Sequence, residues 1–388
     1  MTTLNTPAQR SKIAKGAGLI MNIDIGIIGL PKSGRTTIFN ALTRGQADTG
    51  GHSQEGSPAH IGTAKVSEPR LQGLADILHP KRVVPVSVTY IDVGASIKGL
   101  VEERGIGGEL LNRLSKVDAL INVVRAFENP SVPHHEGSLN IERDITNMNL
   151  ELAFSDLAIM ERRLERIETS LKGAKPPQRQ NLLREQEVLA RIKAELERDI
   201  PVREMGLAPE EARLLSNFQL LTAKPLLIVV NIGEDQLPGA ASLEAQLNSA
   251  YSRPGCRVIA LCGKLEMELA QLEDEAAQGL RREYGLTESG AERVVKASYE
   301  LLELVSFFTI ASNEVRAWPV PSGTEAVKAA GKIHSDMERG FIRAEVISYQ
   351  DLVRCGSLSE ARKKGLLRME GKNYIVQDGD VITFLFNV

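Results

Sequence analysis

The stretch Gly29-Leu-Pro-Lys-Ser-Gly-Arg-Thr-Thr37 decides the fold of this chain. An apolar run over 22–28 precedes it and predicts a short buried strand, while the segment 38–43 that follows has the composition of a helix. Strand, glycine-rich loop and helix in this order match the phosphate-binding pattern G-x-x-x-x-G-K-[ST], except that Arg35 stands at the lysine position. The alternative interpretation, a tight turn that binds nothing, is less favoured by these flanks.

Eight residues of this stretch are candidates for phosphate binding: Gly29, Pro31, Lys32, Ser33, Gly34, Arg35, Thr36 and Thr37. The two glycines let backbone N–H groups turn toward an anion, and the N-terminus of the following helix adds a partial positive charge. Thr36 is placed to offer its hydroxyl to Mg²⁺. Arg35 keeps a positive charge, but its guanidinium is a planar fork rather than the point charge of a lysine. The stretch therefore predicts phosphate binding without fixing where a catalytic charge would lie.

Composition describes an ordinary globular chain. With 388 residues, 42% hydrophobic and 25% charged, it is long enough for roughly two or three domains. The net charge of -3 gives no sign of general affinity for nucleic acid or membranes. Three cysteines without metal spacing favour a reducing cytoplasm and no disulfide partner. No apolar run reaches membrane-spanning length, and residues 1–20 lack a signal-peptide core and are expected to form a flexible leader.

Apolar, strand-like runs recur along the chain, at 83–91, 118–127, 225–231 and 256–262. Continuous apolar strands separated by helices predict an α/β fold with a doubly wound, mostly parallel sheet that is buried on both faces. Ligands of such sheets bind beyond the carboxyl ends of the strands. Asp92 ends the first of these runs and is the second candidate for Mg²⁺ binding, beside Thr36; the alternative is a turn residue at a strand end.

Three segments depart from this alternation. Residues 44–68 show almost no periodicity and are expected to be either a switch loop or a plain surface loop. Residues 147–200 carry apolar side chains three and four apart, interrupted at 172–177, which predicts an inserted antiparallel helical hairpin of coiled-coil type. From residue 304 onward, short strands mixed with helices predict a small α+β domain, whose basic side chains form either a solvated surface or a contact face for RNA.

The chain from Met21 to Val388 resembles the YchF subfamily of Obg-related phosphate-loop NTPases. The most specific matches are Asn231-Ile-Gly-Glu234, Val123-Val-Arg-Ala-Phe-Glu128, Leu221-Thr-Ala-Lys-Pro225, Glu314-Val-Arg-Ala-Trp318 and the stretch 370–380. The resemblance implies a P-loop nucleotide-binding domain over 21–146 and 201–303, the hairpin inserted at 147–200, and a TGS-like domain over 304–388. It also implies ATP or GTP with Mg²⁺ as cofactor, and contact with the ribosome or RNA through the hairpin and the TGS-like domain.

The family reads the base with the motif N-x-x-E, where ordinary GTPases have N-K-x-D. The matching positions are Asn231 and Glu234, together with the turn Cys262, Gly263 and Lys264. The aspartate of ordinary GTPases accepts two hydrogen bonds from guanine, and the glutamate alters that pair of contacts. The resemblance therefore implies that ATP is preferred over GTP.

Four departures from the family pattern fall on the phosphate side. Arg35 replaces a lysine, Ala95 replaces a hinge glycine, Asn122 replaces a histidine, and the switch motif T-x-x-P-N is absent from 50–62. Asparagine cannot serve as a general acid or base, so no catalytic residue is assigned. The sequence predicts a YchF-type protein with slow or impaired hydrolysis that regulates translation or a stress response. A catalytically inactive scaffold or RNA-binding module remains the alternative.

Overall fold

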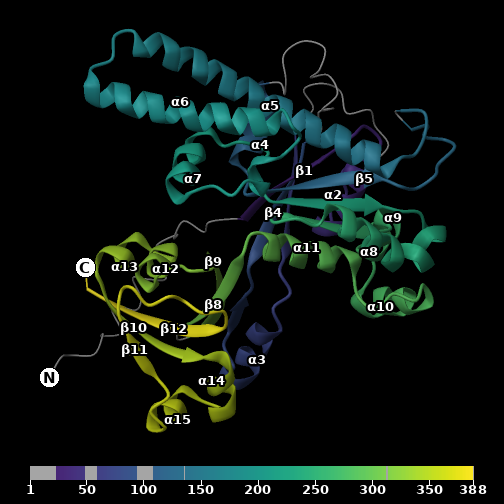
Figure 1. Ribbon diagram of the computed structural model, residues 1–388. Coiled ribbons are helices and arrows are strands. Elements are labelled where there is room, and N and C mark those ends of the chain that lie inside the picture. Colours follow the sequence, from purple (N-terminus) through teal and green to yellow (C-terminus); the bar gives the residue numbers. More distant parts are fainter. Residues whose placement is uncertain (1–22, 49–58, 94–107, 135, 312, 388) are drawn as a thin grey trace. The chain divides into compact units, whose positions relative to one another are not determined.

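The computed structural model describes residues 23–48, 59–93, 108–134, 136–311 and 313–387. The chain divides into two compact units (Figure 1), of which the larger comprises Ile23–Ala64 and Val88–Leu302. The smaller contains Lys65–Ser87 and Glu303–Val388. Residues 65–87, which we expected within the nucleotide-binding segment, are thus grouped with the C-terminal residues.

The larger unit is built on a six-stranded sheet with the order β2-β4-β1-β5-β6-β7. The strands are β1 (Ile23–Gly29), β2 (His60–Lys65), β4 (Ser87–Asp92), β5 (Ala119–Arg125), β6 (Leu226–Asn231) and β7 (Cys256–Leu261). From β4 to β7 every pairing is parallel. This confirms the expected α/β class with a mostly parallel sheet, and it places the carboxyl ends of these strands at one edge.

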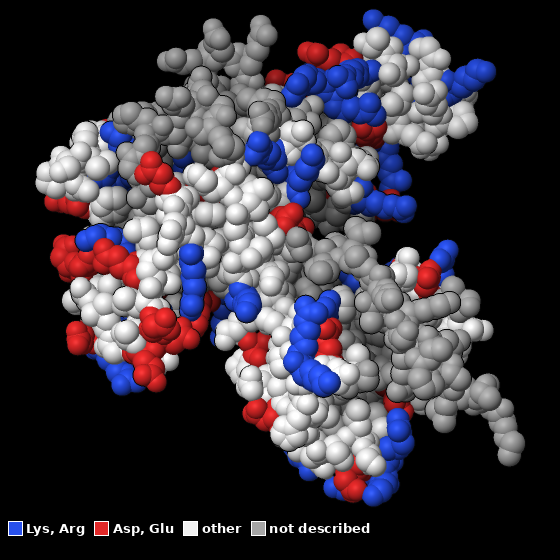
Figure 2. Space-filling view, turned by 180° about the vertical axis from the view of Figure 1, so that it is seen from behind, with Lys and Arg blue, Asp and Glu red and all other residues white. Residues whose placement is uncertain are grey.

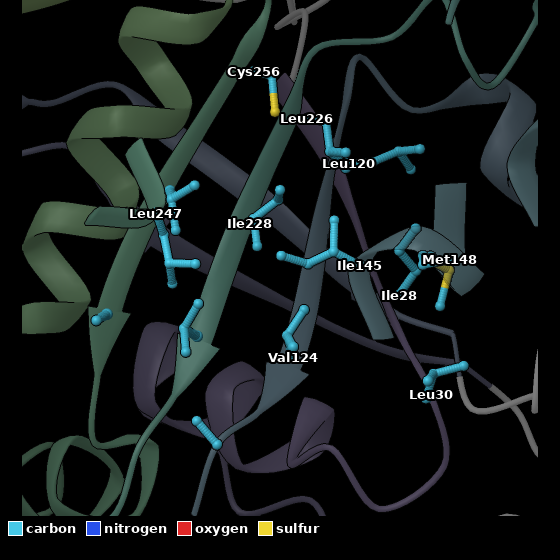
Figure 3. Close-up of a cluster of buried hydrophobic side chains, with 14 of the residues drawn as sticks. Ile28, Leu30, Leu120, Val124, Ile145, Met148, Leu226, Ile228, Leu247 and Cys256 are labelled. Atoms are coloured by element: carbon cyan, nitrogen blue, oxygen red, sulfur yellow. The ribbon is translucent and has the colours of Figure 1, made fainter. Parts of the chain in front are cut away.

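Helices pack on this sheet because its central strands are apolar on both faces; every residue of β5 is buried. The helices and 3₁₀ turns of the unit, apart from the hairpin, are α2 (Arg35–Thr43), α4 (Gly108–Lys116), η2 (Val202–Glu204), α7 (Pro209–Leu215), η3 (Ser216–Phe218), η4 (Glu234–Gly239), α8 (Ala240–Tyr251), α9 (Gly263–Leu269), α10 (Asp274–Glu283) and α11 (Gly290–Leu301). Figure 3 shows the core on one face, where Ile28, Ile228 and Ile145 come from β1, β6 and α5 (Ile141–Leu171).

A long helical hairpin extends from this unit (Figure 1). Its helices α5 (Ile141–Leu171) and α6 (Pro176–Leu196) pack on each other along a buried cluster that includes Met160, Ile167 and Ile192. The Asn140 side chain caps α5 by accepting a hydrogen bond from the Arg143 N–H. The hairpin lies where the apolar spacing predicted it, but its first helix begins at Ile141 rather than near residue 147.

The smaller unit holds a second six-stranded sheet, with the order β11-β10-β12-β8-β9-β3. Its elements are α3 (Pro69–Leu78), β3 (Arg82–Val84), β8 (Leu304–Ala311), β9 (Glu314–Pro321), α12 (Ala326–Ile333), α13 (Ser335–Arg339), β10 (Phe341–Ser348), α14 (Tyr349–Cys355), α15 (Leu358–Lys363), β11 (Arg368–Glu370) and β12 (Asp380–Phe386). The mixture of strands and helices agrees with the expected α+β character.

One strand prediction in this region was wrong. The run 83–91 is not one strand: β3 joins the second sheet, parallel to β9, and β4 joins the first. Pro85 lies between them, and proline has no N–H to continue a ladder. Ile375 forms an isolated bridge with Glu325. Among the described helices, none is long and apolar enough to span a bilayer.

Candidate functional site

The glycine-rich loop joins β1 to α2 in the expected way. Gly34 caps α2 with φ 90°, in the left-handed region, which glycine adopts without steric cost. A Cβ at Gly34 would also collide with the side-chain amide of Asn231. Inside the loop the Ser33 N–H donates to the Leu30 carbonyl at 3.2 Å, and the Ile38 N–H donates to the Gly34 carbonyl at 2.9 Å.

The eight predicted phosphate-binding residues lie together at the end of β1, in the loop and in the first turn of α2. Gly29 and Ser33 are buried, Lys32 is exposed, and Pro31, Gly34, Arg35, Thr36 and Thr37 are half-buried. Lys32 has φ 64°, a left-handed conformation that is uncommon for a residue with a Cβ. The structure thus confirms the loop, while phosphate binding by its residues stays a prediction.

Arg35 points toward the end of β4. Its Nη1 donates a hydrogen bond to the Val93 carbonyl at 2.7 Å. Burial lowers the pKa of Arg35, and the charge of Asp92 opposes that shift. The guanidinium is therefore bound to the protein's own backbone next to the site.

Thr36 and Asp92 meet as predicted for a Mg²⁺ site. The Thr36 hydroxyl donates to Asp92 Oδ2 at 2.7 Å, and Asp92 is only 1% exposed. Among the described residues, Asp92 Oδ1 has no hydrogen-bond partner. Hydroxyl and carboxylate oxygens are hard ligands of the kind Mg²⁺ binds, so the residues present fit the ion.

On the base side, Asn231 connects two loops at the end of β6. Its Nδ2 donates to the Ser33 carbonyl at 3.0 Å, and its Oδ1 accepts from the Gly263 N–H, also at 3.0 Å. A Cβ on Gly263 would lie 2.7 Å from Ile38 Cδ1, so glycine lets this turn approach α2. Asn231 therefore holds the phosphate loop and the predicted base turn in one arrangement.

Glu234 is held by two side chains. Lys264 Nζ donates to its Oε1 at 3.0 Å, and the Tyr284 hydroxyl donates to its Oε2 at 3.4 Å. The negative charge of Glu234 raises the pKa of Tyr284. Tyr284 was not predicted, because it lies directly after α10 and belongs to no sequence motif. Cys262 is buried, and burial raises the pKa of its thiol, so this turn presents backbone rather than the cysteine side chain.

Asn122 lies in the middle of β5, between Ile28 and Ile228. With Pro31, Ser33 and Arg125 it lines a cavity of about 10 Å³ beneath the phosphate loop. Among the described side chains, Ser33 Oγ, Asn122 Nδ2 and Arg125 Nη1 are buried without a hydrogen-bond partner. Residues 44–68, which we expected to be a switch loop or a plain surface loop, are not a loop throughout, because 60–65 form strand β2. The predicted leader 1–20, residues 49–58 and Ala95 lie outside the described residues.

Basic side chains of the smaller unit are largely ion-paired. The pairs are Lys328 with Glu338, Arg339 with Asp336, Arg362 with Glu345 and Lys363 with Glu360. On the face shown in Figure 2, positive and negative side chains lie next to one another. The positive charge that the sequence offers for RNA contact is thus partly neutralised.

Comparison with known proteins agrees with the fold. The family model described as YchF-GTPase_C, a protein of unknown function (DUF933), matches residues 304–387. A ribosome-binding ATPase YchF from Bacillus subtilis is 38% identical over 370 residues, which are 95% of this chain and 100% of that protein. The ribosome-binding ATPase YchF of Escherichia coli O157:H7 is 36% identical over 368 residues, again 95% and 100%.

A solved structure, described as the Schizosaccharomyces pombe YchF GTPase, superposes with a TM-score of 0.80 at 27% identity, covering 94% of this chain and 98% of that one. Relatives more than 30% identical match along nearly the whole chain, and the same chain carries the phosphate loop and the Asn231-Ile-Gly-Glu234 motif. This chain therefore belongs to the YchF family.

Proposed function

We propose that this chain binds a nucleoside triphosphate with Mg²⁺, prefers ATP to GTP, hydrolyses it slowly, and regulates translation or a stress response through contact with the ribosome. The observation that carries the proposal is the Asn231 bridge. It fixes the phosphate loop at Ser33 and the base turn at Gly263 in one rigid arrangement, each through a hydrogen bond of 3.0 Å. A preorganised pair of loops of this kind is what nucleotide binding requires.

Preference for ATP is supported by the partners of Glu234. Guanine offers two N–H donors to the carboxylate that reads it, but both oxygens of Glu234 already accept bonds, from Lys264 and Tyr284. Guanine would have to share these oxygens with Lys264 and Tyr284, because a carboxylate oxygen can accept more than one hydrogen bond, whereas adenine lacks the N1–H and N2–H₂ groups that the carboxylate reads. The names of the relatives do not decide the point, since the bacterial ones are called ATPases and the yeast one a GTPase.

Slow hydrolysis is supported by the position of Arg35. Phosphoryl transfer depends almost entirely on positioning and charge stabilisation. The Arg35 guanidinium donates to the Val93 carbonyl at 2.7 Å, so its charge is directed at the end of β4. Mg²⁺ bound at Thr36 and Asp92 would supply charge stabilisation at the terminal phosphates, and the loop backbone would orient them.

Ribosome contact is proposed from the relatives, two of which are named ribosome-binding ATPases. The helical hairpin and the C-terminal unit are the surfaces we assign to it. Ion pairing within the smaller unit limits a purely electrostatic attraction to RNA. We therefore expect the shape of the protein surface and the bound nucleotide to contribute to ribosome binding.

Calorimetry tests the nucleotide proposal directly. ATP, ADP, GTP and GDP are titrated into the full chain, each with and without Mg²⁺. We expect ATP to bind more tightly than GTP, and Mg²⁺ to strengthen triphosphate binding. Absence of heat with all four nucleotides would refute nucleotide binding and support the scaffold alternative. Cosedimentation with ribosomes, with and without ATP, tests the partner separately.

A further inference from the structure

His60 lies beside the predicted Mg²⁺ site, at the first residue of β2. Its Nδ1 is 3.6 Å from Asp92 Oδ2, and its side chain is 43% exposed. The ring also lies against Phe39, with 6.0 Å between ring centroids. A separation of 3.6 Å is too long for a hydrogen bond. This imidazole nitrogen is therefore close to the carboxylate without being hydrogen-bonded to it.

Three potential ligand groups converge at this point. Thr36 Oγ1 and His60 Nδ1 lie 2.7 Å and 3.6 Å from the same Asp92 oxygen. Adjacent ligands of a six-coordinate ion with bonds of about 2.1 Å are separated by roughly 3 Å. Because the Thr36 hydroxyl donates a hydrogen bond to Asp92, the lone pairs of Thr36 Oγ1 remain available to a metal ion. The spacing is compatible with one ion bound by all three groups after small side-chain movements.

The imidazole of His60, rather than the local charge, favours one class of metal here. The Arg35 guanidinium interacts electrostatically with Asp92, so it lowers the attraction for any divalent cation alike. In the described part of the chain, no group of three or more His, Cys, Asp or Glu side chains could hold a metal ion, so a site at Asp92 and His60 needs the Thr36 hydroxyl as its third ligand. Imidazole binds transition-metal ions well and Mg²⁺ poorly.

We propose that His60 is a further ligand of the divalent cation at Thr36 and Asp92, and that it shifts the site's preference from Mg²⁺ toward a divalent transition-metal ion. The inference rests on the proposed nucleotide site for its location. It goes beyond that function because it assigns a third ligand and a different class of metal.

Metal titration of the full chain tests the proposal. Co²⁺ and Mg²⁺ are titrated separately by calorimetry, without nucleotide and with saturating ADP, and the visible absorption of Co²⁺ reports nitrogen coordination. We expect His60→Ala to lower Co²⁺ affinity at least tenfold, since even outer-shell partners of metal ligands are worth about 10–100-fold. Mg²⁺ affinity should stay within about twofold, because Mg²⁺ is held by the oxygen ligands.

His334→Ala is the surface control. His334 Nδ1 lies 3.5 Å from Asp336 Oδ2, and its side chain is 37% exposed. Its Nδ1 already accepts a hydrogen bond from the Asp336 N–H at 3.1 Å, so it is a His–Asp pair whose nitrogen is engaged and which lacks Thr36. This variant should bind Co²⁺ as the unchanged chain does. Asp92→Asn should weaken both metals, and circular dichroism shows whether each variant is folded.

Equal Co²⁺ affinity in the unchanged chain and His60→Ala would overturn the proposal, as would equal losses in His60→Ala and His334→Ala. Failure of the unchanged chain to bind Co²⁺ more tightly than Mg²⁺ would overturn the metal preference. The ATP titration of the unchanged chain is read independently. Normal ATP binding with no effect of His60→Ala on Co²⁺ would thus refute this inference alone.

Discussion

Replacing Asn231 with alanine should weaken the binding of phosphates that Asn231 itself is not expected to touch. Asn231 is 3% exposed and makes two bonds of 3.0 Å, one to Ser33 and one to Gly263. Each lost hydrogen bond costs about 1 kcal/mol, and a buried partner left unpaired costs about 1–3 kcal/mol. If about 2 kcal/mol of this lost free energy must be supplied to order the phosphate loop when the ligand binds, triphosphate affinity drops about 30-fold.

The assay is calorimetric titration of inorganic tripolyphosphate, which has no base, alongside ATP. Asn248→Ala is the matched control, because Asn248 likewise bridges backbone groups, donating to the Val258 carbonyl at 2.8 Å and accepting from the Val258 N–H at 3.1 Å. We expect Asn231→Ala to weaken both ligands and Asn248→Ala to weaken neither. Loss of ATP binding with unchanged tripolyphosphate binding would refute the bridging argument and limit Asn231 to reading the base.

Three further predictions follow from single contacts. Arg35→Ala should weaken triphosphate binding about tenfold, whereas Arg35→Lys should raise turnover by releasing the Val93 carbonyl. Single-turnover assays separate the effect on binding from the effect on turnover. Unchanged values in both variants would contradict the role of Arg35. Tyr284→Phe frees one oxygen of Glu234 and should narrow the ratio of ATP to GTP affinity, as measured by competition. Burial raises the pKa of Asp156 from 3.8 to about 6. Because the folded state then binds more protons, stability should fall by up to about 3 kcal/mol as pH rises from about 4 to 6; Asp156→Asn should remove this slope in thermal unfolding.

A lysine cannot be introduced into the base-reading motif without disturbing the core. Converting Asn231-Ile-Gly-Glu234 to the guanine-reading N-K-x-D requires a lysine at Ile232. Ile232 is 1% exposed and belongs to the core of the larger unit. A lysine there would be buried among apolar side chains, which is costly unless its charge is paired. Tyr284→Phe tests base selectivity without this cost.

Much of the larger unit could be predicted from sequence because its signals are local. Continuous apolar runs predicted β1, β5, β6 and β7 to within about two residues. The spacing of Met160, Ile167 and Ile192 predicted the hairpin core for the same reason. These patterns succeed because a strand buried on both faces, or a helix buried along one stripe, must be apolar wherever it lies in the chain.

The division of 82–92 between two sheets could not be predicted in this way. β3 and β4 both lie in a stretch rich in β-branched residues, and only Pro85 marks their boundary. Which sheet each one joins depends on its partners, Glu314–Arg316 for β3 and β1 for β4. Those pairings are separated by more than 200 residues in one case and about 60 in the other, and β preference carries no information about distant partners.

The same difference between local signals and distant contacts explains which site residues could be predicted. Asn231, Glu234, Thr36 and Asp92 were predicted because each belongs to a motif or ends a strand, where ligands of parallel sheets gather. Tyr284 and His60 belong to no motif, and their relevance arises only from contact, with Glu234 and Asp92 respectively. Arg35 was predicted to be a site residue, but its hydrogen bond to Val93 was not predicted, because that bond depends on the length of the side chain and the forked shape of the guanidinium. On the base side, the motif residue Asn231 itself makes the hydrogen bonds that join two loops. On the phosphate side, the contacts of Arg35 and His60 cannot be read from a motif. Changes in hydrolysis and metal preference should therefore be sought at Arg35 and His60 rather than at Asn231.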